Sequence, residues 1–166
     1  MESSGKLPRV SASDDHEIRR AVVEDAPDVA RLLHDFNAEY DEPTPPVPEL
    51  AERVRELLKD EQIVTLLAGS PPLGLALFRI RPSLWSSAND VYLEELYVIP
   101  GQRGKGIGRA LLETAIQAAR NAGADHFELT TGETDTEARG LYESLGFTNH
   151  EGAPDGPRML YYELDL

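Results

Sequence analysis

Residues 103–108, Arg-Gly-Lys-Gly-Ile-Gly, combine cations and alternating glycines in a pattern that suits the binding of an anion. We call this stretch the glycine loop. It follows an apolar run at residues 91–99, and from Ile107 onward apolar side chains recur at helical spacing. Alternating glycines let backbone amides converge, and a helix N-terminus adds unpaired N–H groups and a positive dipole. The pattern therefore predicts a loop that binds a strongly anionic group such as a pyrophosphate.

The charges around the glycine loop favour the same interpretation. Three cations crowd the predicted helix start, where the helix dipole disfavours positive charge: Arg103, Lys105 and Arg109. No acid occurs between Glu95 and Glu113, although the net charge of the chain is −14. Taken alone, the loop could also be a glycine-rich turn with solvated cations. It is not a Walker loop, because Gly106 rather than Ser or Thr follows Lys105, and it lacks the third small residue of the dinucleotide fingerprint.

Two adjacent carboxylates, Glu94 and Glu95, interrupt the apolar run ahead of the glycine loop. A solvated surface requires no such pair inside a strand. Adjacent strand residues point to opposite faces of a sheet, so one glutamate is predicted to face a cleft and the other to be structural. The alternative without catalysis is an exposed strand acid.

Three segments in order resemble the GNAT superfamily of acetyl-CoA-dependent N-acetyltransferases, and they cover residues 88–148. The glycine loop, Arg103-x-x-Gly106-x-Gly108, is similar to the family signature Arg/Gln-x-x-Gly-x-Gly/Ala, and residues 92–98 are similar to the fourth strand of the family. The N-terminal half resembles the family only in its pattern of elements.

The third segment is Asp135-x-x-Ala138-x-x-Leu141-Tyr142-x-x-x-Gly146-Phe147. It resembles the Asn-x-x-Ala-x-x-Leu-Tyr-x-x-x-Gly-Phe segment of the family. Asp135 departs from the usual Asn, which puts a side-chain donor contact to the cofactor in doubt, although Asp is a good helix N-cap.

The resemblance implies acetyl-CoA as co-substrate, with its pantetheine arm along the end of the fourth strand and its pyrophosphate on the glycine loop. Backbone amides at the strand end could also polarise the thioester carbonyl. The cofactor-binding residues implied are Leu96, Tyr97, Val98, Arg103, Gly104, Lys105, Gly106, Ile107, Gly108, Arg109, Asp135 and Ala138.

Acetyl transfer to an amine needs a base, because amines have a pKa of about 10, and an acid that protonates the departing thiolate. The resemblance favours Glu94 as the base. The fourth strand of the family carries a bulge that would reverse the facing, so Glu95 is the alternative. Tyr142 is implied as the general acid, and the alternative is a half-buried tyrosine that only packs.

The spacing of apolar residues and turns predicts an α+β fold with a mixed, mostly antiparallel sheet. We expect about six to seven strands flanked by about four helices, as the family resemblance also implies. Predicted strands lie at 16–22, 63–68, 73–80, 91–99, 127–131, 147–149 and 159–164, and predicted helices at 24–36, 50–58, 107–121 and 136–145. We expect one N-acetyltransferase domain at residues 15–166 after a disordered N-terminal segment at 1–14.

The amino-acid composition excludes or disfavours several classes of protein. The 166 residues contain no cysteine, which excludes disulfides and a cysteine acyl-enzyme, and the four histidines lack metal-ligand spacing, so no metal is expected. The acidic balance argues against nucleic acid as partner. No apolar run approaches the ~20 residues that span a bilayer, and the N-terminus lacks the apolar core of a signal peptide. We predict a cytoplasmic protein without a membrane partner and leave a homodimer open.

Residues 41–48 hold four prolines in eight positions and are predicted to form a loop. We call them the proline-rich segment. Acidic residues surround it, with no Lys or Arg between Asp35 and Glu52. The segment is predicted to close over a small primary amine, such as a polyamine or an aminoglycoside-like acceptor. The alternatives are a protein N-terminal or lysine acetyltransferase and a catalytically silent acyl-CoA-binding sensor.

Overall fold

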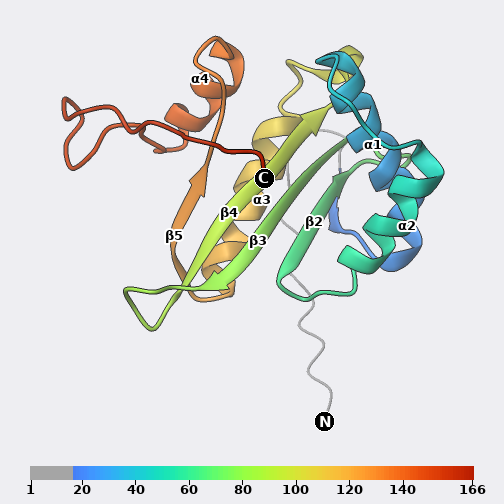
Figure 1. Ribbon diagram of the computed structural model, residues 1–166, viewed down its shortest axis with the longest axis horizontal. Coiled ribbons are helices and arrows are strands. Elements are labelled where there is room, and N and C mark those ends of the chain that lie inside the picture. Colours follow the sequence, from blue (N-terminus) through green and yellow to red (C-terminus); the bar gives the residue numbers. More distant parts are fainter. Residues whose placement is uncertain (1–16) are drawn as a thin grey trace. The chain divides into compact units, whose positions relative to one another are not determined.

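The computed structural model of the protein describes residues 17–166 (Figure 1). The chain divides into two compact units, which meet between Glu128 and Leu129 and are described one after the other. The prediction of a disordered segment at residues 1–14, and His16 of the first predicted strand, lie outside the described residues.

The first unit is built on an antiparallel meander that is extended by one crossover. Its elements are β1 (Ile18–Arg20), η1 (Val23–Asp25), α1 (Ala26–Glu39), α2 (Val47–Leu57), β2 (Ile63–Ala68), β3 (Gly74–Pro82), β4 (Asn89–Val98), η2 (Pro100–Gln102), α3 (Ile107–Asn121) and β5 (Ala124–Leu129). The sheet order is β1-β2-β3-β4-β5, and the pairs from β1 to β4 are antiparallel. The arrows of β4 and β5 point the same way in Figure 1, so the sheet is mixed.

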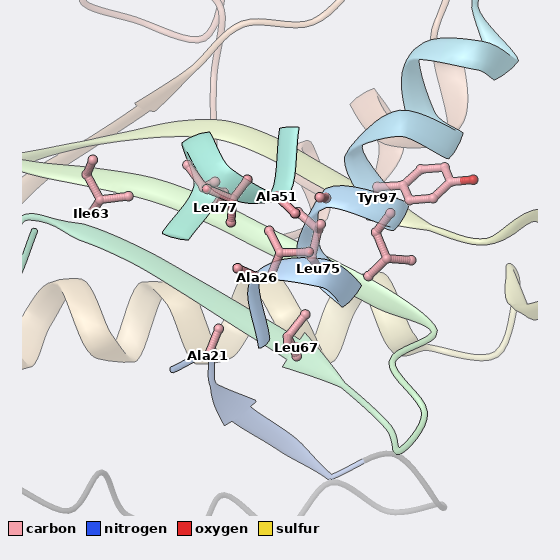
Figure 2. Close-up of a cluster of buried hydrophobic side chains, with 12 residues drawn as sticks. Ala21, Ala26, Ala51, Ile63, Leu67, Leu75, Leu77 and Tyr97 are labelled. Carbon is pink, nitrogen blue, oxygen red and sulfur yellow. The ribbon is translucent and has the colours of Figure 1, made fainter. Parts of the chain in front are cut away.

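Helices cover both faces of the sheet. As a result, β2 and the first half of β3 are buried on both sides, without alternation. Leu75 and Leu77 pack with Ala26 of α1 and Ala51 of α2, as Figure 2 shows. Helix α3 covers the opposite face, where Leu111 contacts the backbone region of Gly74. The predicted helices at 24–36, 50–58 and 107–121 are thus confirmed, and they form a layer on each face of the sheet.

Helix α2 begins earlier than predicted. The helix starts at Val47 with Pro46 as N-cap, so the last residues of the proline-rich segment belong to its first turn. Proline is tolerated there, because the N–H that it lacks would have no partner in the first turn.

The second unit contains α4 (Thr136–Ser144), which starts at the predicted N-cap. The Asp135 carboxylate accepts a hydrogen bond from the Ala138 amide at 3.1 Å, which satisfies one of the free N–H groups of the first turn. After α4 the chain reverses, and His150 and Arg158 form an isolated antiparallel bridge.

The α+β fold is confirmed, but the described residues contain five strands instead of six to seven. The two predicted strands at 147–149 and 159–164 are wrong. The residues between them include Gly152, Pro154, Gly156 and Pro157, and Pro157 has no N–H to donate to a ladder. Pairing within the second unit is therefore limited to a few bonds around the isolated bridge, such as Met159 N to Asn149 O at 2.8 Å.

Candidate active site

The glycine loop joins the end of β4 to the start of α3 through backbone conformations that glycine adopts most easily. Gly104 has φ of 75° and Gly106 has φ of 85°. A Cβ atom added to either would meet no atom within 4 Å, so the backbone conformation and not crowding requires glycine. The space in front of both residues is open.

The N-terminus of α3 directly follows these glycines and offers backbone amides without intrahelical acceptors. Gly106 is the N-cap and provides no side-chain cap bond. The amides of Ile107 and Gly108 belong to the first helical turn, where no intrahelical carbonyl can accept from them. Together with the dipole of a 15-residue helix, these amides form a site that suits phosphate oxygens.

The three predicted cations of this region differ in their surroundings. Lys105 is exposed and donates to the neutral Gln102 side chain at 2.9 Å, and Arg109 is exposed and lies 3.4 Å from Glu113. Arg103 instead donates from both terminal nitrogens to the Glu39 carboxylate, at 2.6 Å each. Glu39 is the last residue of α1, and sequence reasoning did not identify this partner because 64 positions separate the two residues.

The end of β4 offers backbone groups beside the glycine loop. Residues 96–98 pair with β3 on one side, from Ala76 to Gly74. On the other side, β5 starts beside the first residue of β4, because Asn89 N donates to Gly123 O just before β5. Strand β5 has six residues, whereas β4 has ten. Within the first unit, the last residues of β4 therefore extend past the end of β5. The buried Tyr97 side chain packs against Phe36 of α1, so only its backbone faces this edge.

A β-bulge interrupts β4 at the two candidate bases. Leu77 pairs with Glu95 and the next residue, Phe78, pairs with Leu93, which leaves Glu94 as the extra residue. Glu95 therefore shares the face of Leu77, the face that α1 and α2 cover. Glu94 forms an ion pair with Arg79, which is two residues beyond Leu77 on β3 and so lies on that face as well. The bulge thus directs both carboxylates to one face, and the prediction of opposite facing is wrong.

The two glutamates have different electrostatic environments. Glu94 is exposed on the strand and is neutralised by the Arg79 guanidinium. Glu95 is half-buried, and its burial, followed by the negative charge of Glu94, raises its pKa to about 7. Sequence reasoning missed Arg79, although a single arginine after a fully apolar strand segment was a usable signal.

A surface pocket opens beside Glu94. Its walls include Asp60 and Gln62 just before β2, Arg79 of β3, and Tyr92 of β4. Charged side chains of both signs line this pocket together with apolar ones such as Ile63. Within residues 17–166, no three His, Asp or Glu side chains are grouped to hold a metal ion. No helix in the same range combines the length and apolar character needed to cross a bilayer.

The remaining predicted site residues belong to the second unit. Tyr142 is buried in α4, and its ring lies 6.0 Å from the Phe147 ring in an edge-to-face arrangement. Asp135 and Ala138 are joined by the N-cap bond, so the Asp135 carboxylate acts as an acceptor for the helix start. The structure thus groups the glycine loop, the end of β4 and both glutamates in the first unit, and Asp135, Ala138 and Tyr142 on α4.

The chain belongs to the Acetyltransferase (GNAT) family, because the sequence profile of that family matches residues 29–147. A solved structure of a putative acetyltransferase from Arthrobacter sp. FB24 is 46% identical, with a TM-score of 0.84, and covers 95% of this chain and 99% of that one. The mouse thialysine N-epsilon-acetyltransferase is 37% identical over 87 residues, which cover 51% of each chain. Mycothiol acetyltransferase of Beutenbergia cavernae is 41% identical over 69 residues, 40% of this chain and 23% of that protein. The chain thus spans about half or less of these two curated relatives.

Proposed function

We propose that this protein is an N-acetyltransferase that moves the acetyl group of acetyl-CoA directly to a small primary amine. The observation that carries this proposal is the glycine loop, whose positive-φ glycines have open space beside them and lead directly into the first turn of α3. A pyrophosphate bound there would receive backbone hydrogen bonds and the helix dipole, with Lys105 and Arg109 beside it. The family model spans parts of both units, and we propose that residues 15–166 act as one domain.

The pantetheine arm is proposed to follow the end of β4, where it would bond backbone groups as an added strand does. This would bring the thioester towards the bulge, since residues 96–98 directly follow Glu95. An amide of this strand end would then polarise the thioester carbonyl and stabilise the oxyanion that forms on attack.

We assign the general base to Glu95 and an electrostatic role to Glu94. A base works best when its pKa is close to the operating pH, and the pKa of Glu95 is raised to about 7. Glu94 is already occupied by Arg79. In this assignment the Glu95 carboxylate takes a proton from the ammonium form of the acceptor, directly or through water. The neutral amine then attacks the carbonyl carbon, the C–S bond breaks, and the Tyr142 hydroxyl protonates the thiolate.

A cationic acceptor suits the charge of the first unit. Asp41 and Glu42 are exposed at the start of the proline-rich segment, and Asp60 lies in the pocket beside Glu94. Such a field speeds the encounter with amines. The names of the relatives include thialysine, mycothiol and streptothricin acetyltransferases, a range that agrees with an amine acceptor without selecting one.

The proposal is tested by following the release of free CoA thiol from acetyl-CoA with a panel of diamines, amino-acid side-chain amines, aminoglycosides and peptides. Mass spectrometry of each mixture identifies the acetylated product. We expect acetylation of at least one small primary amine with turnover well above hydrolysis. Acetyl-CoA binding without acetylation of any amine would support the silent sensor, and preferential acetylation of peptides would support the protein acetyltransferase.

A further inference from the structure

Arg103, the first residue of the glycine loop, is held by two other elements of the first unit, α1 and β4. Its terminal nitrogens donate to both oxygens of Glu39, at 2.6 Å each, and its Nε donates to the Val98 carbonyl at 2.8 Å. Its guanidinium carbon lies 5.6 Å from the centre of the Tyr97 ring. The side chain thus bridges the end of α1, the end of β4 and the glycine loop.

This arrangement differs from that of a cation kept ready for phosphate. A guanidinium and a carboxylate match in a two-bond fork, which is stronger than a contact between point charges. The pair also lowers the pKa of Glu39 through the hydrogen bonds from Arg103. An arriving phosphate would have to displace a full negative charge from Arg103, whereas Lys105 contacts only a neutral amide.

Glu39 connects the contact to the other side of the proposed active site. It ends α1, and the proline-rich segment follows after Tyr40. Tyr40 packs edge-to-face on Phe36 at 5.1 Å, and Phe36 packs on Tyr97 at 5.6 Å. A continuous set of contacts therefore runs from Arg103 to the root of the segment that we expect beside the acceptor.

We propose that Arg103 and Glu39 are positioning residues that fix the glycine loop and the root of the proline-rich segment relative to each other, and that Arg103 is not itself a phosphate ligand. This inference rests on the proposed function, because it assigns acetyl-CoA to the loop and the amine to the segment. One contact then sets the geometry of both substrate sites.

The test compares acetyl-CoA binding by calorimetry in wild type, Glu39→Gln, Arg103→Lys and the double variant. Loss of the fork should loosen the loop, so Glu39→Gln should weaken acetyl-CoA binding about 5-fold or more, the scale of coupling between sites. If Arg103 bound phosphate directly, Glu39→Gln would free the cation and remove a nearby negative charge, and binding would strengthen. The two explanations thus predict changes of opposite sign in the acetyl-CoA affinity of Glu39→Gln.

Arg103→Lys separates geometry from charge. It keeps the positive charge but cannot form the fork, so the proposal predicts a loss similar to that of Glu39→Gln. Because both changes break the same contact, the double variant should bind no worse than either single variant. Additive losses, or normal binding in Arg103→Lys, would overturn the proposal.

Steady-state kinetics distinguish positioning from a purely structural role, because only positioning changes the acceptor KM and leaves kcat nearly constant. Glu39→Gln should raise the acceptor KM together with the acetyl-CoA Kd while kcat stays within about 3-fold, since no proton-transfer group is changed. Glu52→Gln is the matched control, because it breaks another helix-borne pair, with Arg55 at 2.5 Å, away from the loop. A surface pair contributes little stability, so all variants should fold. A change in acetyl-CoA binding without a change in acceptor KM would overturn the coupling.

Failure of the proposed function would look different. If wild type did not bind acetyl-CoA, hydrogen exchange of the ligand-free protein would still report on the contact. Glu39→Gln should then speed exchange at both residues 103–109 and residues 40–46, and Glu52→Gln should change neither. Faster exchange in only one of the two segments would refute the inference whatever the ligand.

Discussion

Glu94 and Glu95 are consecutive residues whose carboxylates lie on the same face of β4, because the bulge opposite Leu77 and Phe78 removes the usual alternation. Arg79 pairs with the first, and burial raises the pKa of the second to about 7. A neutralised acid beside a titrating acid is an arrangement that separates an electrostatic role from a proton-transfer role.

Glu95→Gln should abolish the general base with little change in shape. We expect kcat/KM for the acceptor to fall about 10²- to 10⁴-fold, the usual effect of one proton-transfer group. In wild type, kcat/KM should rise with pH through an apparent pKa of about 7, because the base must lose its proton. Steady-state rates across the pH range measure both. A variant that kept the rate and the acidic limb of wild type would exclude Glu95 as the base.

Glu94→Gln should shift the acidic limb of the pH–rate profile, the part in which kcat/KM rises with pH, in a defined direction. The charge of Glu94 raises the pKa of Glu95, so its removal should lower that pKa and shift the limb to lower pH. Activity near neutral pH should persist. Glu128→Gln is a suitable control, because Glu128 of β5 also forms an ion pair with an arginine of β3, Arg81, at 2.5 Å. An unshifted limb in Glu94→Gln, or an equal shift in the control, would contradict the coupling.

The same pKa shift predicts how stability depends on pH. The pKa of Glu95 rises from 4.5 to about 7 on folding, so the folded state holds the proton more tightly. Stability is therefore lost as pH rises through that interval. Glutamine mimics the protonated form and does not titrate. The Tm of Glu95→Gln minus the Tm of wild type should therefore increase from about pH 5 to about pH 8. Thermal melts would contradict this if the difference were constant or shrank.

Tyr142→Phe removes one hydroxyl and keeps the ring that packs on Phe147. If this hydroxyl protonates the thiolate, kcat should fall about 10²- to 10⁴-fold while acetyl-CoA binding is retained. A pre-steady-state burst experiment shows whether chemistry limits the rate. Near-normal turnover with chemistry limiting would assign Tyr142 to packing alone.

Local patterns in the sequence predicted most of the fold. The mostly apolar strand β2 and the helical spacing after Ile107 were each recognised with correct bounds or nearly so, because short-range periodicity determines them. The two C-terminal strands were wrong, because apolar content at 159–164 cannot show whether a partner strand is available.

The site was predictable only where it depends on neighbouring residues. Gly104 and Gly106 indicated the loop, since their spacing reflects a local backbone requirement. The shared face of the two glutamates depends on the register with β3, and the Glu39–Arg103 contact joins residues far apart in sequence. Such pairings arise from tertiary packing, which one sequence does not display.

Calorimetric titration of acetyl-CoA into Gly106→Glu and Gly106→Ala tests the phosphate assignment most directly. Both variants impose a side chain on a backbone with φ of 85°, so both carry the same kind of strain. Only glutamate adds bulk and negative charge to the open space before α3. We predict that Gly106→Glu, folded by circular dichroism, binds acetyl-CoA at least about 10-fold more weakly than Gly106→Ala, the scale of a lost charge-assisted contact. Equal affinities in two folded variants would show that acetyl-CoA does not bind at the glycine loop.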